Sequence, residues 1–154
     1  MRVFIADDEP LVLLGFQKMV SACGHEVAGT AATGPEALEE ILRLAPDVMM
    51  MDINLPGMDG ISVIERIQET LHIPAIVITG YQDPAVTARV SAAGVFGYLQ
   101  KPVGKYEIES ALSIAVARYK EQRDAELERD KALTRLSERK LIERAKGLLM
   151  DQFG

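Results

Sequence analysis

Short apolar segments alternate with amphipathic segments along most of the chain, and few folds accommodate this alternation. The apolar segments lie at 2–6, 26–30, 47–51, 75–79 and 95–99. Most of them lack polar–apolar alternation, as expected for strands that are buried on both faces. Helical periodicity follows each one, at 10–22, 35–44, 60–70, 84–93 and from 105 onward. Repeated strand–helix units predict an α/β fold, a doubly wound five-stranded parallel sheet with helices on both faces.

Composition narrows the class of protein. Pro10, Pro35 and Pro84 lie where three helices should begin, a position that tolerates the missing N–H. The net charge of −6 argues against a uniformly basic surface for nucleic acid, although a local basic patch stays open. The single cysteine excludes an internal disulfide framework, and no apolar segment has the length of a signal peptide or membrane span. We therefore expect a cytoplasmic protein without membrane association.

Polar residues gather at the ends of the predicted strands. Asp7 and Asp8 follow the first strand, Asp52 follows the third, Thr79 closes the fourth and Lys101 follows the fifth. In doubly wound sheets, ligands bind outside the carboxyl ends of the strands. These side chains should therefore share one edge of the sheet and form a site there.

The predicted cluster has an excess of negative charge. Two unit charges 4 Å apart repel by about 4 kcal/mol at an effective dielectric constant of 20. Mg²⁺ accepts carboxylate, carbonyl and water ligands, so it fits the cluster, and Lys101 would supply a further positive charge. A metal beside Asp52 also suggests chemistry, because it would let this carboxylate attack a phosphoryl group and become an aspartyl phosphate. Thr79 and Lys101 would then contact the phosphoryl oxygens.

The motifs ADDEP, MDINLPGMDG, VITG and GYLQKP, in this order and at strand ends, resemble the receiver domain of bacterial two-component response regulators over residues 1 to about 120. The resemblance implies a flavodoxin-like sheet with strand order 2-1-3-4-5, a sensor histidine kinase as partner and a cis Lys101–Pro102 bond. It assigns the following roles: Asp52 as phosphoacceptor; Asp7, Asp8, Asp52 and the backbone carbonyl of Asn54 as Mg²⁺ ligands; Thr79 and Lys101 as phosphoryl contacts; and Tyr98, with Thr79, as switch residues.

Each of these residues also has a plain structural explanation. Asp8 could cap the helix near Pro10, and Asp52 could belong to an acidic turn. Thr79, Lys101 and Tyr98, taken singly, fit a strand-end threonine, a solvated lysine and a half-buried aromatic. Their joint placement at one edge favours the functional interpretation.

Two other classes of function compete with a receiver. Mg²⁺-dependent aspartyl-phosphate phosphatases of the haloacid dehalogenase type place a second aspartate two residues after the nucleophile, and this chain has Asn54 there. Without that general acid we expect a slow timer, and no turnover enzyme. In a metal-free interaction scaffold the acidic cluster would bind no metal. A measurement of Mg²⁺ binding would distinguish this class from the other two.

The last segment predicts a long helix, because no proline follows residue 105. We expect a receiver domain at 1–119, a charged helical linker at 120–134 and the start of an output domain at 135–154. A sustained heptad repeat is not evident in the linker, so a coiled coil and a homodimer stay open.

The segment RKLIERAKGLLM resembles the first helix of the ANTAR domain, an RNA-binding module of transcription antitermination regulators. The resemblance covers about twenty residues, and ANTAR modules have three helices, so we expect a fragment of a longer regulator that binds RNA when complete. The residues expected to face RNA are Arg139, Lys140, Arg144, Ala145, Lys146 and Gly147. A DNA-binding regulator and a stand-alone receiver are the alternatives, the former weakened because no helix-turn-helix pattern follows.

Overall fold

Strands and helices alternate along the whole chain in this computed structural model, which describes residues 1–80, 84–93 and 95–153. The side chains of 91, 92 and 147–153 are outside the description. In chain order the elements are β1 (Arg2–Ala6), α1 (Pro10–Ala22), β2 (Glu26–Ala31), α2 (Gly34–Leu44), β3 (Val48–Asp52), α3 (Gly60–Gln68), β4 (Ala75–Thr79), α4 (Pro84–Ala92), β5 (Gly97–Gln100) and α5 (Lys105–Phe153).

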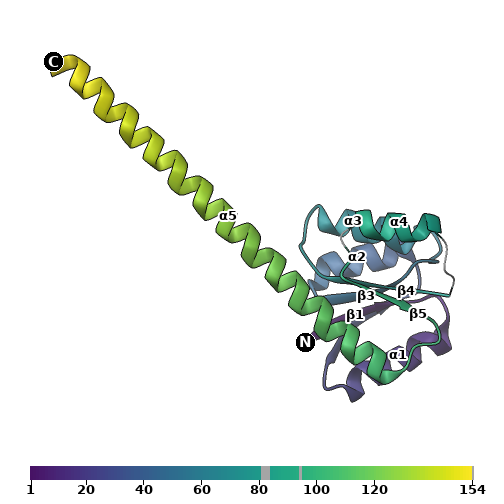
Figure 1. Ribbon diagram of the computed structural model, residues 1–154. Coiled ribbons are helices and arrows are strands. Elements are labelled where there is room, and N and C mark those ends of the chain that lie inside the picture. Colours follow the sequence, from purple (N-terminus) through teal and green to yellow (C-terminus); the bar gives the residue numbers. More distant parts are fainter. Residues whose placement is uncertain (81–83, 94, 154) are drawn as a thin grey trace. The chain divides into compact units, whose positions relative to one another are not determined.

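The five strands form one parallel sheet in the order β2-β1-β3-β4-β5. Figure 1 shows α2, α3 and α4 on one face of this sheet and α1 with the first turns of α5 on the other. Strands β3 and β4 are buried along their whole length, as their continuous apolar sequences predict. The predicted fold class and strand order are confirmed.

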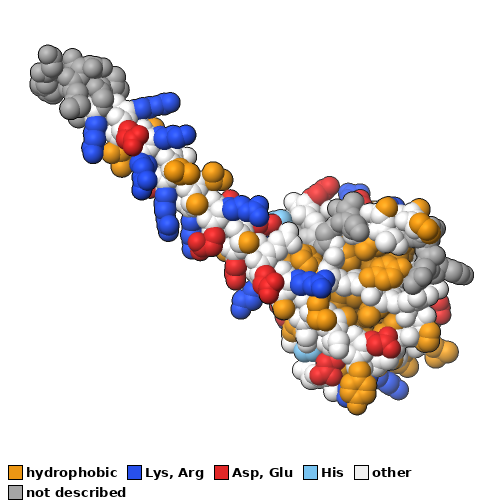
Figure 2. All heavy atoms as spheres, viewed as in Figure 1, with side chains coloured by type: hydrophobic (Ala, Val, Ile, Leu, Met, Phe, Trp, Pro, Cys, Tyr) orange, Lys and Arg blue, Asp and Glu red, His pale blue; other side chains and the backbone are white. Residues whose placement is uncertain are grey.

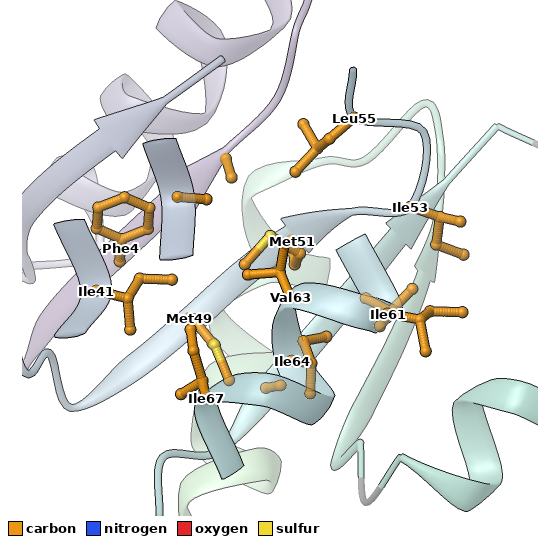
Figure 3. Packing of buried hydrophobic residues seen from close by; sticks show 14 of the residues in the cluster. Phe4, Ile41, Met49, Met51, Ile53, Leu55, Ile61, Val63, Ile64 and Ile67 are labelled. Carbon is orange, nitrogen blue, oxygen red and sulfur yellow. The ribbon is translucent and has the colours of Figure 1, made fainter. Parts of the chain in front are cut away.

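Two apolar clusters fill the space between the sheet and its helices. On one face, Met49 and Met51 of β3 turn toward α3, where Val63, Ile64 and Ile67 meet them (Figure 3). On the other face, side chains of β1, β3 and β4 pack against α1 and the first turns of α5. Because successive residues of a strand point to opposite faces, the three consecutive methionines of β3 contribute to both clusters.

Three strands differ in their bounds from the sequence-based prediction: β2 ends one residue later, at Ala31, and β3 and β5 lie further along the chain. Strand β3 begins at Val48, one residue later than predicted. Asp47 precedes it, where its carboxylate accepts a hydrogen bond from the N–H of Arg2 at 2.7 Å and its own N–H donates to the Arg2 carbonyl at 2.9 Å. The strand extends to Asp52, which pairs in register with Ile78 of β4. The strand predicted at 95–99 begins at Gly97, since its ladder with β4 starts opposite Ile76.

The chain divides into two units, Met1–Arg118 and Tyr119–Gly154, and α5 runs through both. In the second unit every described side chain from 120 to 146 is exposed except that of Arg123. The exposed apolar residues include Leu127, Leu133, Leu136, Leu141 and Ile142. No helix in the described part of the chain combines the length and the apolar character that a membrane crossing requires.

Candidate functional site

The carboxyl ends of the strands bring the predicted site residues together. Asp7 follows β1 directly, Asp52 and Thr79 are the last residues of β3 and β4, and Lys101 follows β5. Since all five strands are parallel, these ends lie at one edge of the sheet. Asp7, Asp52 and Thr79 are buried at 1%, 3% and 2% exposure, whereas Asp8 is exposed.

Lys101 is the cation of this site. Its Nζ lies 2.9 Å from Asp7 Oδ2, 3.1 Å from Asp52 Oδ2 and 3.8 Å from Glu9 Oε1. The backbone N–H of Lys101 donates to the carbonyl of Thr79 at 2.8 Å, and the Lys101–Pro102 peptide bond is cis, as the resemblance implies. One ammonium group therefore faces three carboxylates.

The carboxylates of Asp7, Asp8 and Asp52 offer oxygens within 4.8 Å of one another. Asp7 Oδ2 is buried and has no hydrogen bond of good geometry among the described residues, although Lys101 lies nearby. A buried oxygen of this kind, in a set of hard oxygen donors with excess negative charge, fits a divalent cation such as Mg²⁺. The adjoining pocket of about 330 Å³ is lined by Asp8, Glu9, Asp52, Asn54, Gly80 and Lys101.

Burial and pairing shift the pKa values of this site in ways that bear on its chemistry. Burial raises the pKa of Asp52, and the hydrogen bond from the Asn54 backbone N–H with the contact to Lys101 only partly offsets it. Burial alone would lower the pKa of Lys101, but its contacts with Asp7 and Asp52 outweigh burial and raise it. Lys101 therefore stays protonated at neutral pH.

The loop between β3 and α3 is held by backbone contacts at two glycines. The N–H of Gly60 donates to the carbonyl of Ile53 at 2.9 Å, and a Cβ at Gly60 would lie 2.1 Å from the carbonyl oxygen of Asp52. The N–H of Gly34 donates to the carbonyl of Pro56 at 2.9 Å, and a Cβ there would lie 2.0 Å from the Met58 carbonyl. These contacts fix the backbone that carries Asp52.

Other predicted site residues lie apart from this cluster. Tyr98 is 36% exposed on β5. Arg139, Lys140, Arg144, Ala145 and Lys146 are exposed on α5, and Gly147 lies outside the described side chains. Figure 2 shows Lys and Arg side chains along this part of the helix. Asp8 does not cap α1, because the N-cap position is Glu9 and no side-chain hydrogen bond caps the helix.

Sequence reasoning missed two features of the surface. Glu9 and Gly80 line the pocket, and their positions next to Asp8 and Thr79 could have indicated this. A larger groove of about 500 Å³ lies away from the acidic cluster, along β5 and α5, lined by Phe96, Gly97, Tyr98, Leu99, Tyr106, Glu107, Ser110, Ala111, Ile114 and Arg118. Hydrophobic side chains gather over this area (Figure 2).

Comparison with known proteins gives consistent results. The profile of the response regulator receiver domain matches residues 3–113. The chain is 36% identical over 153 residues to the transcriptional regulatory protein PdtaR of Mycobacterium tuberculosis, and the aligned region covers 99% of this chain and 75% of that protein. It is 43% identical over 107 residues to a protein-glutamate methylesterase/protein-glutamine glutaminase of Geobacter metallireducens, covering 67% of this chain but only 31% of that protein.

Solved structures show the same architecture. The signal receiver domain of a modulated diguanylate cyclase from Desulfovibrio desulfuricans superposes with a TM-score of 0.73 at 29% identity, covering 78% of this chain and 96% of that one. A CheY-like receiver domain protein from Methanospirillum hungatei gives a TM-score of 0.72 at 25% identity, covering 79% and 97% of the two chains.

Proposed function

The chain belongs to the response regulator receiver family, and on this premise we propose that it accepts a phosphoryl group on Asp52 in a two-component phosphorelay. The observation that carries the proposal is the buried Asp52 carboxylate, paired with Lys101 at 3.1 Å and gathered with Asp7 and Asp8 at the carboxyl edge of the sheet. The donor would be a sensor histidine kinase, the usual partner of this family.

Mg²⁺ would be held by Asp7, Asp8, Asp52 and the backbone carbonyl of Asn54. The excess of carboxylates over ammonium groups supports this assignment, as does the buried Asp7 Oδ2, which is paired with Lys101 but has no hydrogen bond among the described residues. When bound, the ion supplies positive charge that neutralises the oxygens of an incoming phosphoryl group.

Asp52, Lys101 and Thr79 would each have a separate role in the phosphoryl transfer. An oxygen of Asp52 attacks phosphorus, the bond from phosphorus to the donor breaks, and the leaving group keeps the electron pair. Lys101, already within ion-pair distance of Asp52, would follow the phosphoryl oxygens, and the hydroxyl of Thr79 would donate to one of them. Asn54 supplies no general acid, so the acyl phosphate should form and decay slowly, as a timer requires.

Phosphorylation of Asp52 tests this function. Incubation with Mg²⁺ and acetyl phosphate should add one phosphoryl group per chain, measured by intact mass. Asp52→Asn should abolish the addition, because an amide is not a nucleophile for this reaction. Asp124→Asn, at an exposed position of α5, is the matched control and should label like the wild type. Labelling of the Asp52→Asn chain to the wild-type level would refute the assignment.

The signal of phosphorylation would pass from the site to the surface through Thr79 and Tyr98. A phosphoryl group brings close to two negative charges, so it should draw the Thr79 hydroxyl toward Asp52. Tyr98 lies three residues before Lys101 and is partly exposed, so it can turn into the space that Thr79 vacates. The surface formed by α4, β5 and α5 would change as a result.

The output would be RNA binding that controls transcription antitermination, in a longer protein that contains this chain. Support comes from the similarity to a transcriptional regulatory protein over nearly the whole chain and from the exposed cations on α5. Replacing Arg139, Lys140 and Arg144 together by Gln in the longer protein should weaken RNA binding and reduce its salt dependence. With fewer phosphate contacts, fewer counterions are released from the RNA on binding. Unchanged affinity and salt dependence would remove α5 from the interface.

A further inference from the structure

Helix α4 is attached to the rest of the receiver by few large side chains. Its sequence, PAVTARVSA, is rich in small residues, and Val90 is its buried apolar side chain among those described. Val86 is partly buried and packs against the same apolar cluster. Figure 1 shows α4 beside α3 on one face of the sheet. An additional polar contact between these two helices would therefore matter for the position of α4.

Arg89 of α4 makes such a contact with the first turn of α3. Its guanidinium Nη2 lies 3.1 Å from Asp59 Oδ1, 3.3 Å from Asp59 Oδ2 and 3.3 Å from Ser62 Oγ. Asp59 is the N-cap of α3, and its carboxylate also accepts from the N–H and the hydroxyl of Ser62 at 3.0 and 2.8 Å. The three residues form one connected cluster that joins two helices.

The α3 side of this cluster is fixed to the acceptor strand. Gly60 follows Asp59, its N–H is bonded to the Ile53 carbonyl, and there is no room for a Cβ between it and the carbonyl oxygen of Asp52. Burial would raise the pKa of Asp59, but its hydrogen bonds from Ser62 and Arg89 outweigh burial and lower it. The carboxylate is therefore charged and ready to pair with Arg89 at neutral pH.

The α4 side lies close in sequence to the residue proposed to move. Only four residues separate Thr79, at the end of β4, from Pro84, at the start of α4. Helix α4 is therefore the first helix that follows Thr79 along the chain, and we take it as the element that responds when the Thr79 hydroxyl moves toward Asp52. Because α3 is fixed to β3, a movement of α4 must stretch or break the contact of Arg89 with Asp59.

We propose that Arg89, Asp59 and Ser62 form a latch that holds α4 in its resting position and thereby opposes phosphorylation of Asp52. The proposal rests on the proposed function and identifies Arg89 as a positioning residue that never touches the phosphoryl group. By linkage, an interaction present only in the resting form weakens the binding of any ligand that favours the other form. Breaking the latch should therefore strengthen the binding of a phosphoryl mimic.

The expected effect is modest because the latch is partly solvated. The side chains of Arg89 and Asp59 are 46% and 37% exposed. Pairs of this kind are screened by water, so their loss should change an equilibrium by about 2- to 5-fold.

Titration calorimetry with beryllium fluoride as the phosphoryl mimic, at saturating Mg²⁺, tests the latch. Arg89→Gln and Asp59→Asn should each tighten binding by about 2- to 5-fold, and the double variant should bind no more tightly than either single one. Asn is a good N-cap, so Asp59→Asn removes the charge and keeps the cap. Arg43→Gln is the matched control and should leave binding unchanged, because among the described residues Arg43 pairs with Glu40 inside the same helix, α2.

Hydrogen exchange of the free proteins supplies the second measurement. Arg89→Gln should speed exchange of the α4 amides relative to those of α1, and Arg89→Lys should restore part of the protection. Faster exchange without tighter binding of the mimic would show a merely structural contact and overturn the proposal, as would unchanged exchange and binding. If the wild type fails to bind the mimic, the proposed function fails and the latch fails with it. If the wild type binds the mimic and the variants bind it equally tightly, the latch alone is wrong.

Discussion

At the scale of single residues, the charge balance of the site depends on which carboxylates pair with its one lysine. Lys101 lies within 3.1 Å of both Asp7 and Asp52, whereas Asp8 extends into solvent at the rim of the pocket. The two buried acids therefore each pair with Lys101, whereas Asp8 has no ion pair among the described residues. Asp8 should consequently contribute most when an added cation binds.

Asp8→Ala should remove most of the stabilisation by Mg²⁺. The wild-type unfolding midpoint should rise on addition of millimolar Mg²⁺, since a ligand that binds only the folded form stabilises it. The rise should be much smaller for Asp8→Ala, and the metal-free variant should be at least as stable as the wild type because like-charge repulsion falls. Glu9→Gln, at the same rim but outside the proposed ligands, should keep the wild-type rise. Equal gains for Asp8→Ala and the wild type would exclude Asp8 as a ligand.

Asp59 gives a prediction about pH. Its pKa in the folded chain lies below the ordinary value of 3.8, so its contribution to stability is complete above about pH 4 and is lost as the pH falls through the lowered pKa. Asp59→Ala should cost about 1 kcal/mol at pH 7, as the loss of an N-cap does. Urea unfolding of both proteins at several pH values should show the difference shrinking in acid. A difference that is as large at pH 3 as at pH 7 would contradict the role of the charge.

At the scale of elements, the alternation of strands and helices was predictable because apolar segments alternate with amphipathic ones, and the segments at 2–6, 47–51 and 75–79 are followed at once by a charged residue or a glycine. The strands at 2–6 and 75–79 and the helix at 10–22 were placed to the residue. The parallel sheet then put Asp7, Asp52, Thr79 and Lys101 at one edge, so the site followed from the topology. Asp47 was predicted in the third strand but precedes it, bonded through its side chain and its N–H to the distant Arg2.

Contacts between distant exposed residues could not be predicted in this way. Arg89 and Asp59 are thirty residues apart, and no periodicity relates them. The groove along β5 and α5 likewise depends on how a strand edge and a helix meet, which single-sequence patterns do not encode. Topology therefore fixes the position of the strand ends, whereas surface pairs depend on helix orientation.

Two glycines provide an element-scale test of close packing. Gly34→Ala should destabilise the fold by about 1–3 kcal/mol, because its Cβ would overlap the carbonyl of Met58 in the β3–α3 loop. Gly15→Ala in α1 is the matched control: its nearest neighbour would be Met19 Cε at 3.9 Å, so the variant should gain about 0.5–1 kcal/mol from helix propensity. Denaturant unfolding free energies decide the matter. If both variants shift in the same direction, steric exclusion at Gly34 is not the controlling factor.

At the scale of the whole molecule, we propose that the groove along β5 and α5 of the receiver unit is the surface on which a second copy would associate. The groove along β5 and α5 exposes 81% of Tyr106 and 49% of Ile114. Glu107 and Arg118 also line it, eleven residues apart on α5, which is about three helical turns and therefore one face. In a two-fold interface the same patch meets itself, so each glutamate could face the arginine of the other copy.

The proposed switch predicts that phosphorylation favours this dimer. A coupling typical of allosteric switches would strengthen dimerisation by about 5- to 150-fold. Sedimentation velocity with and without beryllium fluoride should show the shift. Glu107→Arg and Arg118→Glu should each weaken the dimer, and the double exchange should restore it, because the complementary charges return in reversed positions. A dimerisation constant unaffected by the mimic would show that the signal leaves the site by another route. A double exchange no better than the single variants would place the interface elsewhere.

The ion pairs of Lys101 determine which group of a small acyl phosphate, the acyl or the phosphoryl group, can be transferred to the site. An amine attacks an acyl carbon only through a free lone pair, and the raised pKa of Lys101 keeps that pair bound to a proton. Lys101, 3.1 Å from the proposed acceptor Asp52, is thus poorly able to become acetylated. A donor such as acetyl phosphate would therefore transfer its phosphoryl group to Asp52 and leave as acetate, without acetylating Lys101, and each new transfer would follow hydrolysis of the earlier acyl phosphate.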